Sequence, residues 1–259
     1  MSQPPVLMIH GAFCGGWVFE AFAGAFAKAG YSVSAPDLPG HAAGSPRDDA
    51  AGLSMSDYAE AVAEAARALP APPVLVGHSL GGLVCLMAAT RAPTAGLVLL
   101  APSGPWGVGG STMEEAISAL SLYALGPYWA GAVEPDYATF RRYAVDRLDR
   151  TGRHAAFARA RPESGRALFE TLNWWLDPFM TTFVSPEKIG APILAFSGER
   201  DLVHAPSTVA ETARRLGARF ELLPEMSHWL PAEPGWEEVA RLALDWLSET
   251  RADLAAAAE

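Results

Sequence analysis

The stretch VLVGHSLGG, residues 74–82, places a serine among closely spaced glycines directly after an apolar run. Glycine loses more backbone entropy on folding than any other residue, so glycines this dense indicate a turn that side chains would obstruct. The residues before the turn predict a buried strand, and the nearly all-apolar stretch 80–90 predicts a buried helix. Such a turn strains Ser79 and exposes its hydroxyl, with Gly77 and Gly81 present because any Cβ would collide with the neighbouring turns.

Leu80 follows the serine and begins the predicted helix, so its backbone N–H has no acceptor within the helix. A free N–H at a helix start can face a negatively charged oxygen that develops next to the serine. The pattern G-x-S-x-G alone is weak, because glycine and serine are common in this chain. The strand-turn-helix setting is what makes Ser79 the predicted nucleophile.

Short apolar runs alternate with helical stretches along most of the chain. The predicted strands cover residues 6–9, 31–36, 73–77, 96–102, 192–198 and 219–224. The predicted helices cover residues 17–29, 56–69, 80–90 and 234–254. Continuous apolar strands separated by helices indicate a parallel sheet covered on both faces. We therefore expect an α/β fold with a mostly parallel six-stranded sheet and helices on both faces.

The segment 103–188 interrupts this alternation. It contains helical stretches but no convincing strand, and it holds four of the eight tryptophans and four of the six tyrosines. A helical, aromatic insertion between sheet strands is typical of a cap over the carboxyl edge, where open α/β sheets bind ligands. We expect a core of residues 1–102 and 189–259 and a helical cap of residues 103–188. The aromatic residues expected to line the substrate pocket are Phe13, Trp106, Trp129, Trp175 and Trp229.

The composition limits the partners of the chain. A net charge of −10 over 259 residues disfavours binding to the phosphate backbone of nucleic acids. No apolar run approaches the roughly 20 residues of a spanning helix, and the first residues do not resemble a signal peptide. Cys14 and Cys85 do not make a disulfide framework. We expect a cytoplasmic monomer or homodimer that binds neither nucleic acid nor membrane.

A serine nucleophile needs a base, and the chain has six histidines. His228 follows the last predicted strand, on the loop edge that also holds Ser79. It also comes last in the chain, as the order Ser…Asp/Glu…His requires. We expect the side chain of His78 to point away from Ser79, and His204 to lie on the surface. The predicted base is therefore His228.

The third member of such a triad is a carboxylate near the end of the fifth predicted strand. The stretch FSGERDLVH, residues 196–204, offers Glu199 and Asp201. Asp201 lies further into the loop, where it can reach His228. Glu199 suits a role in bracing the turn or in pairing with Arg200. Asp201 is therefore the predicted orienting acid.

These motifs follow the order found in the α/β-hydrolase superfamily, which the chain resembles over essentially its whole length. The matching stretches are HGAFCGGW (10–17), APDLPGH (35–41), VGHSLGG (76–82), FSGERD (196–201) and SHWLPAEPGWEEVA (227–240). The first and last resemble in particular the group with small-molecule carboxylesterases, methyl esterases and hydroxynitrile lyases. The resemblance implies an α/β-hydrolase fold with Ser79 as nucleophile, His228 as base and Asp201 as orienter. It also implies an oxyanion hole made by the backbone N–H groups of Ala12 and Leu80.

The residues and the resemblance together predict a serine hydrolase that cleaves carboxylic esters through an acyl-enzyme. The expected partner is a small or medium, apolar or aromatic ester. No cofactor is expected, and no metal site either, because no His, Cys, Asp and Glu cluster has metal-ligand spacing. Eight arginines in the segment 103–188 could instead attract an anionic substrate, although a solvated face with acidic partners is the simpler interpretation. They are Arg141, Arg142, Arg147, Arg150, Arg153, Arg159, Arg161 and Arg166.

Other functions are compatible with the same residues. Hydroxynitrile lyases that resemble this chain use a pocket lysine and a threonine at the position of Gly11, whereas the only lysines here are Lys28 and Lys188. A lactonase or a perhydrolase would use the same triad. A ligand sensor without catalytic activity could also use this fold, because a fold does not determine function.

Overall fold

The computed structural model describes residues 3–256, and within them the main sheet has six strands in parallel pairs. Their order across the sheet is β2-β1-β3-β4-β7-β8. The strands are β1 (Val6–Ile9), β2 (Val33–Ser34), β3 (Val74–His78), β4 (Gly96–Leu100), β7 (Ile193–Gly198) and β8 (Arg219–Leu223). The predicted fold class is confirmed, and each predicted strand has its counterpart.

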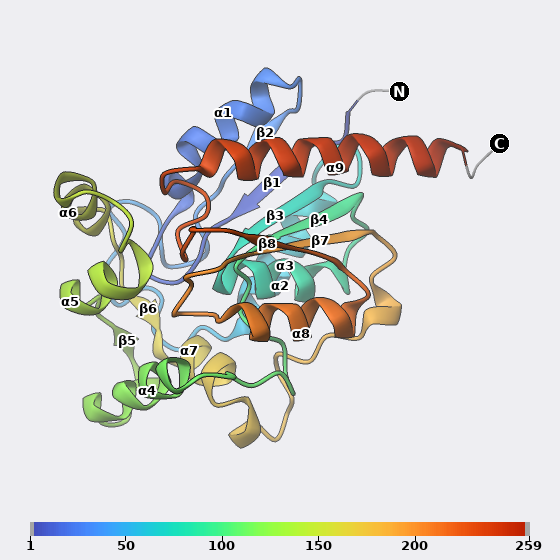
Figure 1. Ribbon diagram of the computed structural model, residues 1–259. Coiled ribbons are helices and arrows are strands. Elements are labelled where there is room, and N and C mark those ends of the chain that lie inside the picture. The colour runs from blue at the N-terminus through green and yellow to red at the C-terminus, as the bar shows by residue number, and fades with distance from the viewer. Residues whose placement is uncertain (1–2, 257–259) are drawn as a thin grey trace.

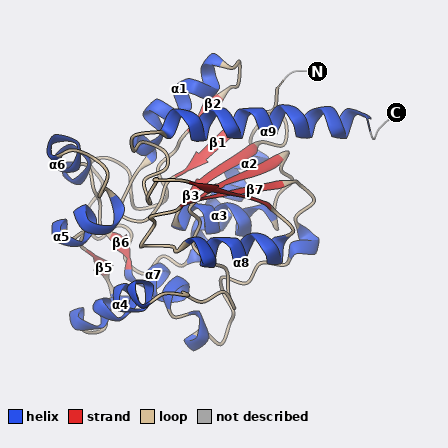
Figure 2. Ribbon diagram, viewed as in Figure 1, coloured by secondary structure: helices blue, strands red, loops and turns tan. Residues whose placement is uncertain are grey.

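Helices cover both faces of this sheet (Figures 1 and 2). One face carries α1 (Glu20–Lys28) and α9 (Trp236–Ala256), and the other carries α2 (Met55–Arg67), α3 (Leu80–Ala89) and α8 (Pro206–Leu216). Helix α8 does not appear among the predicted helices. All residues of α3 are buried, as its lack of polar side chains predicts.

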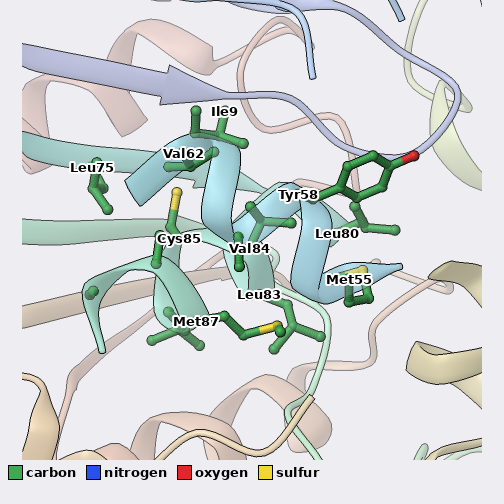
Figure 3. Close-up of a cluster of buried hydrophobic side chains, with 14 of the residues drawn as sticks. Ile9, Met55, Tyr58, Val62, Leu75, Leu80, Leu83, Val84, Cys85 and Met87 are labelled. Atoms are coloured by element: carbon green, nitrogen blue, oxygen red, sulfur yellow. The ribbon is translucent and has the colours of Figure 1, made fainter. Parts of the chain in front are cut away.

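Each sheet face has its own apolar core, because side chains alternate between the faces along a strand. From β1, Leu7 and Ile9 pack with α2, α3 and α8, whereas Val6 and Met8 pack with α1 and α9. Figure 3 shows the first of these cores, in which Leu83, Val84 and Cys85 of α3 belong to one buried cluster with Val62 of α2. The two cores fix the strands that end at the candidate site.

Strand β2 is shorter than predicted. The prediction covers residues 31–36, but only Val33 and Ser34 pair with β1. Strand β2 lies at the edge of the sheet, so it has a partner on one side only. Beyond it, Asp37 Oδ1 accepts a hydrogen bond of 2.7 Å from the N–H of Gly16. The end of the predicted strand therefore belongs to a loop that holds the segment after β1.

Residues 103–188 are called the insertion from here on, and most of them lie beyond one end of the main sheet (Figure 1). The regular helices of this part are α4 (Met113–Ser121), α5 (Tyr137–Thr139), α6 (Arg150–Ala158) and α7 (Gly165–Leu172). Short helical turns cover Leu122–Leu125, Tyr128–Ala130, Phe140–Ala144, Trp174–Leu176 and Pro186–Lys188. A further short turn in the core covers Gly16–Phe19 and precedes α1.

The expectation of no strand in the insertion is wrong. Strands β5 (Ala132–Val133) and β6 (Glu163–Ser164) form a small antiparallel pair. Two residues are too few to show the alternation by which a strand is recognised in a sequence. Among the residues described, no helix has the length and apolarity needed to span a membrane.

Candidate active site

Ser79 occupies a strained turn between β3 and α3. Its backbone has φ 53° and ψ −124°, which side-chain-bearing residues rarely adopt. A Cβ at Gly77 would lie 2.5 Å from the carbonyl oxygen of Gly81, and one at Gly81 would lie 2.3 Å from that of His10. The predicted reason for both glycines is therefore present in the structure. The turn is held by the Ser79 N–H, which donates to the Leu100 carbonyl at 2.9 Å.

His228 and Asp201 meet at the same edge of the sheet. Asp201 follows β7 and His228 follows β8, and His228 Nδ1 lies 2.8 Å from Asp201 Oδ2. The other carboxylate oxygen, Oδ1, accepts the N–H groups of Val203 at 2.8 Å and His204 at 2.9 Å. Burial alone would raise the pKa of Asp201, but the His228 imidazole and these hydrogen bonds hold it below its ordinary value. With Nδ1 donating to this carboxylate, Nε2 of His228 is left as the basic nitrogen.

One cavity of about 660 Å³ brings these elements together with the insertion. Ser79 and His228 both line it, and so do Ala12 and Leu80, the two residues expected to form an oxyanion hole. Asp201 is 3% exposed and reaches the site through His228. Leu80 is the first residue of α3, so its N–H has no acceptor within that helix. The arrangement provides a hydroxyl, a base and backbone donors around one space.

Three of the five aromatic residues expected in the pocket line the cavity, namely Phe13, Trp175 and Trp229. Trp106 and Trp129 are outside its lining. Trp106 packs edge-on against Trp174, with ring centroids 5.3 Å apart, and it is Trp174 that reaches the cavity. Trp129 packs against Phe169 and is 42% exposed on the outside of the insertion. Aromatic content in the sequence does not reveal which way each ring points.

The expectation that His204 lies on the surface is wrong. The residue is buried and lines the cavity, and its Nε2 lies 2.9 Å from the hydroxyl oxygen of Ser103. Burial, reinforced by nearby His228, lowers the pKa of His204 to about 4, so the imidazole is neutral near pH 7. A neutral imidazole and a hydroxyl therefore form one polar part of the cavity wall, which elsewhere is largely apolar but also includes Glu115, Glu134 and Asp136.

His78 supports the loop that carries His228. Its Nε2 donates to the carbonyl oxygen of His228 at 2.8 Å, and the two ring centroids are 4.9 Å apart. Burial lowers the pKa of His78 to about 3, so this ring stays neutral. The sequence predicts that the His78 side chain points away from Ser79. In the structure its ring packs against His228, the predicted base, and the residue also lines the cavity.

Two carboxylates, those of Glu233 and Glu199, accept backbone hydrogen bonds from the loop that carries His228. Glu233 Oε1 accepts the Ser227 N–H at 2.7 Å, one residue before His228, and burial raises the pKa of Glu233 to about 7. Glu199 Oε2 accepts the Glu225 N–H at 3.2 Å, which fits its expected role in the turn. Arg200 pairs with Glu225 and not with Glu199. Sequence reasoning missed Glu233, whose only signal is its position in the motif after His228.

None of the arginines of the insertion is among the residues that line the cavity in the described chain. Arg159 pairs with Glu20, Arg166 pairs with Glu170, and Arg161 donates to the Ser45 carbonyl. Acidic and backbone partners therefore take up much of this charge. Within residues 3–256, no group of three or more His, Cys, Asp or Glu side chains is placed to hold a metal ion.

Comparison with known proteins places the chain in a family. The profile of the Alpha/beta hydrolase family matches residues 6–242. A pyrethroid hydrolase of Sphingobium wenxiniae is 35% identical over 105 residues, which are 39% of this chain and 36% of that protein. A pimeloyl-[acyl-carrier protein] methyl ester esterase of Xanthomonas oryzae pv. oryzae is 38% identical over 115 residues, 44% of this chain and 42% of that protein. The alignments thus span about two fifths of these curated relatives' lengths.

Solved structures share the fold at low sequence identity. A methylesterase from Arabidopsis superimposes with a TM-score of 0.74 at 18% identity, over 95% of this chain and 99% of that one. Polyneuridine aldehyde esterase gives a TM-score of 0.69 at 17% identity, over 94% and 99% of the two chains. Since the family profile spans nearly the whole sequence and the fold agrees, this protein belongs to the alpha/beta hydrolase family.

Proposed function

We propose that this protein is a serine esterase that hydrolyses small or medium, apolar or aromatic carboxylic esters, with the insertion acting as a cap. The observation that carries the proposal is a cavity lined by both Ser79, in its strained turn, and His228, which is hydrogen-bonded to Asp201. Neighbouring family members support ester cleavage, because several are named methyl ester esterases.

The proposed reaction proceeds in two halves. His228 Nε2 removes the proton of the Ser79 hydroxyl as its oxygen attacks the ester carbonyl, and the N–H groups of Ala12 and Leu80 stabilise the resulting oxyanion. His228 then gives this proton to the leaving alcohol, which leaves an acyl group on Ser79. A water molecule, deprotonated by His228, releases the carboxylic acid and restores the hydroxyl.

The cavity supports a largely apolar substrate of limited size. A volume of about 660 Å³ lies within the usual 300–1,000 Å³ of small-molecule sites. Its walls are largely apolar, with the insertion contributing Val133, Phe140, Leu168 and Trp174. Apolar walls stabilise apolar substrate groups by about 25 cal/mol per Å² of surface removed from water. The absence of arginine from the described lining disfavours the alternative of an anionic substrate.

Hydroxynitrile lyase activity has less support. A Cβ at Gly11 would lie 3.0 Å from the Ser79 Cβ and 3.1 Å from His78 Nδ1, so a threonine there would crowd the serine. Lys28 and Lys188 are both exposed, and neither lines the cavity. Lactonase and perhydrolase activities would use the same groups as the esterase, so substrates must separate them.

The test is a panel of p-nitrophenyl esters from acetyl to palmitoyl, with a lactone and a cyanohydrin, measured as kcat/KM. We expect the highest values for short or medium esters, and loss of turnover in Ser79→Ala. Preferred turnover of the cyanohydrin would favour the lyase. Peak activity on palmitoyl esters at an oil–water interface would contradict the proposed substrate size.

A further inference from the structure

Glu163 is a fully buried carboxylate at the start of β6 in the insertion. Its four hydrogen-bond partners are all donors. Oε2 accepts from the Phe13 N–H at 3.3 Å and lies 3.1 Å from His41 Nε2. Oε1 accepts from the Tyr58 hydroxyl at 2.7 Å and from the Ser164 N–H at 2.8 Å. Glu163 therefore links the insertion to three separate parts of the core, and none of the steps proposed above uses it.

The charge of Glu163 is balanced by His41. The second ring nitrogen of His41, Nδ1, lies 3.1 Å from the Pro39 carbonyl oxygen, so both nitrogens face acceptors and both carry protons. Burial opposes this charge, but Glu163 raises the pKa of His41 above its ordinary value. Burial likewise opposes the charge of Glu163, and His41 and Tyr58 hold its pKa below the ordinary value. The pair is thus a buried carboxylate–imidazolium.

The neighbouring histidine stays neutral. The Leu38 N–H donates to His10 Nε2 at 2.9 Å, so the proton of His10 sits on Nδ1, which donates to the Gly11 carbonyl at 2.9 Å. Burial, together with the charge of His41, lowers the pKa of His10 to about 4. Of the two imidazoles, only that of His41 is charged and paired with Glu163. The Tyr58 hydroxyl, which also donates to Glu163, points out of the apolar cluster (Figure 3).

The backbone of Phe13 is held on both sides by this part of the insertion. Its N–H donates to Glu163, and its carbonyl accepts the Arg161 N–H at 2.9 Å. Phe13 has φ 63°, a left-handed conformation that non-glycine residues rarely adopt unless their surroundings enforce it. It directly follows Ala12, whose N–H is one of the proposed oxyanion donors. The insertion therefore fixes the peptide next to the proposed oxyanion hole.

We propose that Glu163 is a positioning residue, whose carboxylate holds the Phe13 N–H and thereby keeps the Ala12 N–H aimed at the oxyanion. The effect on catalysis rests on the proposed function, whereas the hold on the loop does not. As a consequence, the side chain of Glu163 both holds the insertion against the core and keeps the oxyanion hole in its active geometry. Displacement of β6 from the core would disorder residues 11–14 as well.

Glu163→Gln tests this proposal with little change of shape. A glutamine has one acceptor oxygen for the two backbone donors, Phe13 and Ser164. The Ser164 N–H, at the shorter distance of 2.8 Å, competes better for it, so the amide NH₂ turns toward Phe13. The matched control is Tyr58→Phe, which removes another hydrogen bond to the same carboxylate and leaves those to Phe13 and His41 in place. If Glu163→Gln does not fold, Glu163→Asp keeps the charge and withdraws it by one methylene.

Three readouts separate positioning from general destabilisation. In Glu163→Gln we expect kcat to fall about tenfold or more, approaching the 10²–10³ of a lost oxyanion donor, with KM unchanged. Affinity for a boronic acid, which forms a tetrahedral adduct with the serine, should fall by a similar factor. Hydrogen exchange of residues 11–14 should accelerate in Glu163→Gln and not in Tyr58→Phe.

Equal loop exchange in Glu163→Gln and Tyr58→Phe would overturn the hold on the loop. Faster exchange with unchanged kcat and unchanged boronic acid affinity would overturn the role in positioning the oxyanion hole. If the unaltered protein hydrolyses no ester, the proposed function fails, and hydrogen exchange still decides whether Glu163 holds the loop.

Discussion

Replacing Asp201 with asparagine should reverse the proton arrangement of His228. Asp201 Oδ1 accepts two backbone N–H groups, from Val203 and His204, and these donors keep their positions in the variant. The amide oxygen of the introduced asparagine must therefore take the Oδ1 position, which turns the NH₂ group toward His228 Nδ1. Nδ1 then has to accept a hydrogen bond, so the ring proton moves to Nε2. In that tautomer, Nε2 cannot accept the proton of Ser79.

The expected loss follows from this geometry. A histidine held in the wrong tautomer costs a serine hydrolase about 10⁴ in kcat, or roughly 5.5 kcal/mol at 1.36 kcal/mol per decade. KM should change little, because Asp201 reaches the cavity only through His228. The assay is kcat and KM for a short p-nitrophenyl ester, with an active-site titration to correct for inactive protein.

Glu199→Gln is the matched control. It makes the same carboxylate-to-amide change two residues away, on an exposed side chain that accepts only the Glu225 N–H among the bonds described. We expect its kcat to equal that of the unaltered protein. Asp201 is not the orienting acid if Asp201→Asn keeps kcat within about tenfold of the unaltered protein, or if Glu199→Gln is the variant that loses activity.

Two further predictions concern stability, both measured by urea unfolding. Gly77→Ala should destabilise the fold by more than about 1 kcal/mol, because the added Cβ would lie 2.5 Å from the Gly81 carbonyl oxygen. Gly24→Ala, whose added Cβ would have no neighbouring atom within 4 Å, should stabilise α1 by about 0.5–1 kcal/mol. If Gly77→Ala and Gly24→Ala changed the free energy of unfolding equally, the backbone around Gly77 would have to rearrange to accept the added methyl group, which would contradict this prediction. Glu233 has its pKa raised from 4.5 to about 7, so the fold should lose stability as the pH rises through that window. Glu233→Gln should flatten this dependence, and an unchanged pH profile would contradict it.

The sheet and the serine turn could be predicted because their signals are local. Strands buried on both faces are continuous apolar runs, which is why β3 and β7 were recognisable. Gly77 and Gly81 are required by backbone approaches within a single turn. The edge strand β2 was overestimated, because its sequence continues to look extended after the pairing ends.

The surroundings of the site depend on contacts between distant segments. Glu163 contacts Phe13, which lies 150 residues away in the sequence, and His204 contacts Ser103, which lies 101 residues away. No local sequence pattern can predict either contact. His204 looked exposed because it sits in a polar loop, but the cavity wall closes around it. The two-residue strand β6, which carries Glu163, is below the length at which periodicity can be read.

The most direct test of the central claim is the mass and position of the adduct formed with a fluorophosphonate, which reacts with activated serine hydroxyls. We predict one adduct per folded chain, on the peptide that contains Ser79, with no adduct in Ser79→Ala or in the unfolded protein. An adduct on another residue, or undiminished ester hydrolysis by Ser79→Ala, would contradict it.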